Sequence, residues 1–167
     1  PPMKNYGFTL VELLIAMGLM AIFTTFIVSN LRSSRESAVA DQTVKNIQST
    51  VKLAQTNASS GVKCGNDGGA HWMVEFYSNH SILKCQYQTN IAQEIWSYDL
   101  PTNFTMSVED QLGTCSFAGV TFAPVTGQIS LSCGGIVENQ LLELTISNSG
   151  GYSKGFTINQ QGVINEL

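Results

Sequence analysis

Charged side chains are scarce in this sequence, and basic ones are almost absent from its second part. Only 12% of the 167 residues are charged, and from Cys64 onward nine acids stand against two lysines, Lys84 and Lys154. A region of this sign repels a polyanion instead of attracting it. We therefore do not expect nucleic acid as a partner of this part of the chain.

Groups that typically carry catalysis are equally few. The two histidines, His71 and His80, stand apart, no serine lies in a nucleophile-elbow pattern, and the acids are scattered. The glycine-rich loop around Asp67 offers too few oxygen ligands to assign calcium. The sequence predicts a protein that is not an enzyme, with no metal site and no cofactor.

Four cysteines, Cys64, Cys85, Cys115 and Cys133, lie in the second part of the chain. Their spacing is too wide for paired zinc knuckles, and no histidine is grouped with them. Two disulfides in an oxidising compartment are the preferred interpretation, and four buried thiols are the alternative. Three connectivities are possible; we predict Cys64–Cys85 and Cys115–Cys133, with the partners of each bond in neighbouring strands.

One long apolar run stands out near the start of the chain. Residues 8–28 contain a single ionisable side chain, Glu12. About 21 helical residues cover roughly 30 Å, the thickness of the hydrocarbon core of a bilayer. No small-residue cleavage site of a secretory signal follows the run. It predicts one transmembrane helix that stays in the mature protein.

Residues 29–60 contain neither proline nor glycine, so we expect the helix to continue through them. Apolar residues recur there at steps of four and three, which places them on one face that packs against a partner: Ala40, Val44, Ile47, Val51 and Ala54. Gly61 can adopt the left-handed conformation that ends a helix. The sequence thus predicts one rod from Phe8 to about Ser60.

After Gly61 the apolar periodicity changes to two, which is typical of strands with one buried face. The fold class expected is α+β, with the long N-terminal helix packed on an antiparallel β-sheet or β-sandwich head over residues 61–167. The predicted strands are Trp72–Tyr77, Ile82–Gln88, Glu94–Tyr98, Phe104–Glu109, Ser116–Phe122, Gln128–Cys133, Leu141–Ser147 and Tyr152–Ile158.

The segment from Gly7 to Ile15, GFTLVELLI, follows Lys4 closely and opens the apolar run. It resembles the class III signal of type IV prepilins and pseudopilins. The resemblance implies a pilin-like fold, removal of the leader 1–7 by cleavage after Gly7, and methylation of Phe8. It also implies the partners: the prepilin peptidase, other pilins or pseudopilins, the inner-membrane assembly platform and membrane lipid.

Glu12 has two interpretations. An ionisable side chain inside a membrane helix is costly without a partner, and cleavage would create a cationic amine on Phe8 that Glu12 of a neighbouring subunit could neutralise. Such a pair sets register more than it adds stability. Alternatively, Glu12 lies at the lipid interface near a helix N-terminus, where a carboxylate is mildly favoured.

The runs Val120–Ile129 and Phe156–Ile164 look like the two glycine-turn strand pairs that end GspH/FimT-type heads, although generic hairpins are the alternative. About 34 residues follow Cys133, whereas many major pilins close a disulfide near the C-terminus. The function expected is a minor pilin or pseudopilin that primes or caps a type IV pilus or a type II secretion pseudopilus. It would reside in the bacterial inner membrane as a single-pass protein with a periplasmic head, or outside the cell in a pilus. A DNA-binding competence minor pilin and a major pilin are the alternatives.

Overall fold

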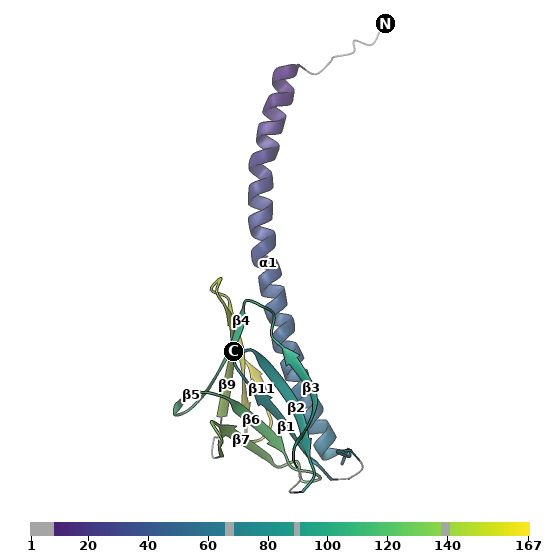
Figure 1. Cartoon of the computed structure of the whole chain (residues 1–167). Coiled ribbons are helices and arrows are strands. Elements are labelled where there is room, and N and C mark those ends of the chain that lie inside the picture. Colours follow the sequence, from purple (N-terminus) through teal and green to yellow (C-terminus); the bar gives the residue numbers. More distant parts are fainter. Residues whose placement is uncertain (1–8, 66–68, 89–90, 138–140) are drawn as a thin grey trace. The chain divides into compact units, whose positions relative to one another are not determined.

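The computed structural model describes residues 9–65, 69–88, 91–137 and 141–167, with backbone alone for 26–33. The chain consists of one long helix followed by eleven strands among these residues (Figure 1). It divides into two compact units, Pro1–Ala38 and Val39–Leu167. The second unit contains the later part of the helix together with all the strands, and we call it the head.

Helix α1 runs from Leu10 to Ser59, close to the predicted bounds. It ends as expected at Gly61, whose φ is 65°. The amide of Gly61 donates to the carbonyl of Ala58 (3.2 Å), and the amide of Val62 donates to that of Asn57 (2.9 Å). These two bonds form a Schellman motif, which satisfies carbonyls that the helix end would leave unpaired.

Within the head, α1 buries the predicted apolar stripe. Ala58 extends the stripe by one turn. The five predicted members are each at most 1% exposed: Ala40, Val44, Ile47, Val51 and Ala54. The stripe belongs to one core with the inward side chains of the strands. Burial of this face, more than helix propensity, stabilises this part of α1.

The strands form two sheets in which every pairing is antiparallel. The first sheet has the order β3 (Gln93–Asp99), β2 (His80–Gln86), β1 (His71–Phe76), β6 (Ala118–Phe122), β7 (Ile129–Cys133) and β8 (Ile136–Val137). The second has the order β11 (Ile164–Glu166), β10 (Ser153–Asn159), β9 (Leu141–Asn148), β4 (Phe104–Asp110) and β5 (Gly113–Cys115).

Alternation of buried and accessible residues explains why these segments are strands. In β1 the buried residues are Trp72, Val74 and Phe76, and those between them are half-exposed. Strands β4 and β9 alternate in the same way. Each of the eight predicted strands overlaps an observed one, whereas the short strands β5, β8 and β11 were not predicted.

The structure contains two disulfides with the predicted pairing, Cys64–Cys85 and Cys115–Cys133. The expected placement in neighbouring strands is wrong. Cys64 lies before β1, in the segment that follows α1. Cys115 lies in β5 of the second sheet and Cys133 in β7 of the first, so this bond joins the two sheets. The sequence periodicity that locates a strand carries no information about which sheet it joins.

Candidate functional site

The first candidate site is the N-terminal segment with the predicted processing and assembly residues. Gly7 and Phe8 lie outside the described residues, so their roles remain predictions. Glu12 lies in the first turn of α1 and is exposed. Its carboxylate accepts hydrogen bonds from the Thr9 amide (3.3 Å) and the Thr9 hydroxyl (3.2 Å).

The Thr9 hydroxyl oxygen also accepts a bond from the Glu12 amide at 3.3 Å. These reciprocal contacts form a capping box, in which an N-cap residue and the third helical residue satisfy each other's backbone amides. The pattern Thr-x-x-Glu before an apolar run could have been recognised in the sequence. The contact fits the interpretation of Glu12 as a residue of the helix N-terminus, and it leaves its role in assembly untested.

The surface of α1 that follows Glu12 is apolar on all sides. Its large apolar residues between Leu10 and Phe23 are each more than half exposed. A helix that is apolar all round is normally covered by lipid or by other protein. Within the part of the chain that the structure describes, α1 does not contain an apolar stretch of the length that a membrane span requires.

In the head, a polar cluster holds α1 against β10. The Lys154 ammonium lies 2.7 Å from a carboxylate oxygen of Asp41, and the Tyr152 hydroxyl donates to the same oxygen at 3.2 Å. The hydrogen bond from Lys154 holds the pKa of Asp41 below its usual value, and the pKa of Lys154 is raised in turn. These mutual contacts indicate a structural role and not a reactive pair. We call the contacts of Asp41 with Lys154 and Tyr152 the clasp.

A second polar cluster lies on the outer face of the first sheet. Glu75 accepts from the Lys84 ammonium at 2.7 Å and from the Tyr77 hydroxyl at 2.6 Å. The bond to Glu75 raises the pKa of Tyr77 to about 12. The Tyr77 ring stacks on His80, with the centroids 4.6 Å apart. Because each polar group is paired locally, the cluster stabilises the sheet and offers no evident nucleophile or base.

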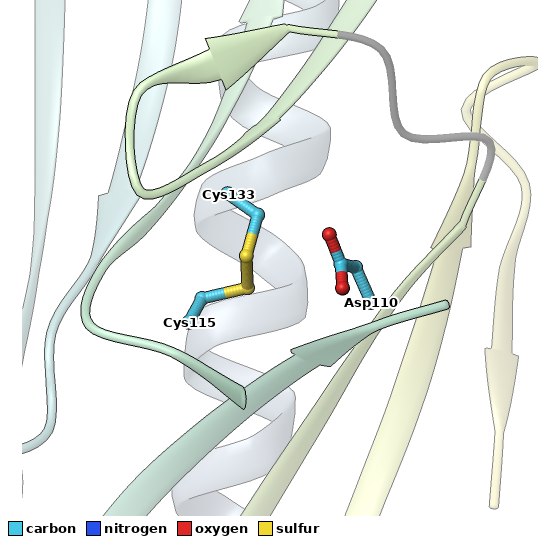
Figure 2. A group of neighbouring side chains, drawn as sticks. All are labelled: Asp110, Cys115 and Cys133. Atoms are coloured by element: carbon cyan, nitrogen blue, oxygen red, sulfur yellow. A yellow bond between two sulfur atoms is a disulfide. The ribbon is translucent and has the colours of Figure 1, made fainter. Parts of the chain in front are cut away.

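A third group of side chains could in principle hold a metal: Asp110, Cys115 and Cys133 (Figure 2). Their possible ligand atoms lie within 4.8 Å of one another. Figure 2 shows that the two sulfur atoms are bonded to each other. Metal binding by cysteine requires the thiolate, so this group cannot bind a metal while the disulfide is intact. One Asp110 oxygen, moreover, accepts from the amides of Leu112 (2.7 Å) and Gly113 (2.9 Å). The loop around Asp67, considered for calcium, falls in the undescribed residues 66–68.

An open groove of about 460 Å³ lies along β6 and β7. Its lining includes His71, Thr121, Gln128, Ser130 and Val137. No acidic or basic side chain other than His71 is among the residues that line it. The prediction that the protein is not an enzyme stays a prediction.

A sequence model of the family described as "Prokaryotic N-terminal methylation motif" matches residues 2–28. The matched region includes Gly7, Phe8 and Glu12. No curated protein and no solved structure matches the chain. The motif supports a type IV pilin-like protein and suggests that it is anchored in a membrane or associated with a pilus. More particularly, it indicates a subunit of the pilin or pseudopilin type, processed by a prepilin peptidase and assembled with other pilins.

Proposed function

We propose that this protein is a minor pilin or pseudopilin of the GspH/FimT type, which assembles through α1 into a type IV pilus or a type II secretion pseudopilus. The observation that carries the proposal is the exposed apolar surface of α1, which lies within the region that matches the methylation motif. In a filament this surface would be covered by the helices of neighbouring subunits. Before assembly it would lie in the inner membrane, with the head in the periplasm.

The head supports the choice of a minor subunit. Its core is built from one helix and two antiparallel sheets, and glycine turns at Gly127 and Gly162 join β6 to β7 and β10 to β11. The disulfide Cys115–Cys133 is followed by strands β8 to β11 and so lies well before the C-terminus. These features fit a subunit that primes or caps a filament.

We assign a structural role and not catalysis or DNA binding. The paired clusters around Asp41 and Glu75 stabilise the head, and each of its two lysines beyond residue 63, Lys84 and Lys154, already pairs with an acid. On residues 64–167, DNA would therefore meet a mostly acidic surface.

Glu12 provides the test, because its two interpretations predict different mutants. If Glu12 neutralises the Phe8 amine of a neighbour, assembly needs its charge. If it only caps α1, assembly needs a hydrogen-bond acceptor that can reach Thr9. Glutamine serves at this position of a capping box but is neutral, so Glu12→Gln separates the two roles.

The experiment compares wild type with Glu12→Ala, Glu12→Gln and Glu12→Asp. For each, the amount of processed protein in the membrane is measured against the amount in sheared filaments. We expect all four to be processed and inserted. Incorporation into filaments should fall strongly for Glu12→Ala and Glu12→Gln and partly for Glu12→Asp, because the shorter side chain keeps the charge but misplaces it.

Normal incorporation of Glu12→Gln together with loss in Glu12→Ala would reduce Glu12 to a helix cap, worth about 0.5–2 kcal/mol. Equal incorporation in all four, in filaments that contain many copies of the protein, would reject an assembly role for Glu12. A subunit at the filament tip would tolerate the loss of the Glu12 charge, because no neighbour lies above it. In that case quantitative mass spectrometry should give close to one copy per filament.

A further inference from the structure

Four strands form the edges of the two sheets, and three of them are short. β8 has two residues, and β5 and β11 have three each. Short edge strands are a common protection against pairing with another chain. β3 differs from them, because this edge strand has seven residues, of which six are exposed. Among the strands that the structure describes, β3 therefore offers the longest edge to a partner.

The free side of β3 carries backbone groups that a further strand could bond. The amide of the residue that follows β3 donates to the carbonyl of the residue that precedes β2, at 2.9 Å. In an antiparallel ladder such hydrogen-bonded pairs alternate with non-hydrogen-bonded pairs. In this register, Trp96 and Tyr98 are the residues that bond to β2. The amides and carbonyls of Ser97 and Asp99 therefore point away from β2, toward the free side.

Trp96 shows that the core is incompletely covered at this edge. It lies directly opposite Leu83 of β2, which is buried, so its ring is on the core side of the sheet. Trp96 is nevertheless 44% exposed, and its ring stacks on Tyr98 with the centroids 5.8 Å apart. Tyr98 contacts α1, because its hydroxyl donates to the Thr43 hydroxyl at 3.5 Å. An added strand would bury the part of Trp96 that the chain itself leaves exposed.

The charge of the edge indicates the kind of partner. Glu94 and Asp99 of β3 are exposed, and within the described parts of the chain neither forms an ion pair. Lys84, the cross-strand partner of Glu94, lies 2.7 Å from a carboxylate oxygen of Glu75. An acidic edge repels an acidic strand and attracts a basic one. The edge of β3 therefore favours a strand that contains lysine or arginine.

A second copy of this chain does not offer such a strand among its described residues. Its lysine-containing strands are β2 and β10, and each of them lies between two other strands of its sheet. Pairing of β3 with β3 of a second copy would instead bring four acids together, two from each strand. The occupant is therefore a segment of a different protein.

We propose that the free edge of β3 is a docking site for an extended, basic segment of another protein. The segment adds a strand to the first sheet through main-chain hydrogen bonds to Ser97 and Asp99. One of its apolar side chains covers Trp96, and its basic side chains lie beside Glu94 and Asp99. The main-chain bonds supply affinity and the side chains supply specificity. The contact needs only one copy of this chain, as in a minor subunit.

Synthetic peptides test this site on the purified full-length protein in detergent. One peptide, as long as β3, alternates valine with lysine, and its matched control alternates valine with glutamate. Hydrogen exchange followed by NMR reports whether a peptide pairs with the backbone of β3. We expect the lysine peptide to slow exchange of the Ser97 and Asp99 amides, and the glutamate peptide to leave it unchanged. Equal slowing by both peptides, or by neither, would overturn the proposal.

Two variants at Ser97 test whether binding uses the backbone. Ser97→Pro removes an amide on the free side of β3, and an edge strand tolerates proline at such a position. The matched control, Ser97→Thr, keeps the amide. We expect Ser97→Pro to weaken binding of the lysine peptide by about tenfold or more, and Ser97→Thr to stay within about twofold of wild type. Unchanged binding to Ser97→Pro would reject strand addition.

Charge reversal tests the choice of partner and does not depend on the proline variant. Glu94→Lys combined with Asp99→Lys should bind the glutamate peptide in preference to the lysine peptide. An unchanged preference for lysine would contradict the assignment. Dimers of the wild-type protein that Ser97→Pro abolishes, detected by analytical ultracentrifugation, would assign the edge to a second copy and overturn the proposed partner. Each of these failures leaves the proposed function intact, because none concerns assembly through α1.

Discussion

Truncation of Ile47 to alanine removes a central member of the stripe that joins α1 to the two sheets. Ile47 is fully buried, in the same cluster as Val44 and Val51. Replacement of a buried isoleucine by alanine typically costs about 2–5 kcal/mol, from lost transfer free energy and the cavity that remains. Alanine's better helix propensity returns at most about 0.7 kcal/mol. The net loss expected is therefore about 1.5–4 kcal/mol.

The matched control is Leu53→Ala, on the same helix. Leu53 is 49% exposed, so its truncation removes less buried surface, leaves no closed cavity and should cost under about 1 kcal/mol. Thermal unfolding of the full-length proteins in detergent measures the difference, with tryptophan fluorescence as the signal. Trp72 is a suitable reporter because it is buried and its indole N–H donates to the Val62 carbonyl at 3.2 Å.

At about 2–4 °C per kcal/mol for a chain of this size, Ile47→Ala should lower the midpoint by roughly 3–16 °C, and Leu53→Ala by less than about 4 °C. Equal losses in the two variants, or a smaller loss for Ile47→Ala, would refute the reasoning. Either result would mean that the stripe of α1 is not the face on which the sheets pack.

Three further predictions concern the head. Replacing both Cys115 and Cys133 with serine should lower the free energy of unfolding by about 3 kcal/mol, because the bond closes a sequence separation of 18 residues; denaturant titration measures this. Gly162→Ala should destabilise more than Gly127→Ala in the same titration. Both glycines have positive φ. A Cβ added at Gly162 would lie 2.5 Å from the Cδ1 atom of Ile129 in β7, whereas a Cβ added at Gly127 would meet no atom within 4 Å. The pKa of Asp41 is lower in the folded protein than its value of 3.8 in the unfolded chain. The contacts of Asp41 with Lys154 and Tyr152 therefore stabilise the head fully at pH values above 3.8, and this stability is lost as the pH falls through the folded pKa. Asp41→Asn should therefore flatten the acid side of the stability profile; the same slope as wild type would contradict this.

Local features of the sequence predicted the elements of the fold well. The four-three spacing of Val44, Ile47 and Val51 identified the buried face of α1, and Gly61 identified its end, because both signals are contained within a few residues. The alternation of Leu142, Leu144 and Ile146 likewise located β9, and all three residues are buried.

The arrangement of the strands was not predictable in the same way. β1 pairs with β6, and β4 pairs with β9, across long stretches of chain. These pairings depend on how the two sheets share one core, which no local period reports. For the same reason the clasp between Asp41 and Lys154, and the position of Cys115 and Cys133 in different sheets, appeared only in the structure. The short strands β5, β8 and β11 contain too few residues to show alternation.

The candidate site was recognised from its motif and not from its geometry. Glu12 attracted attention as the single ionisable residue of an apolar run, and the methylation-motif match covers it. Its contact with Thr9 could also have been inferred, because the capping box has a sequence signature. The position of Glu109 opposite Glu143 could not be inferred from the sequence, because it depends on the register between β4 and β9.

Intact-mass analysis of the membrane form tests the central claim most directly. The methylation motif predicts that the wild-type protein begins at an N-methylated Phe8, with the segment through Gly7 removed. In Gly7→Leu the bulk beside the scissile bond should block the peptidase, so this variant should retain that segment and carry no methyl group. A wild-type protein that keeps residues before Phe8, or a Gly7→Leu protein that still begins at methylated Phe8, would contradict the assignment as a pilin-type subunit.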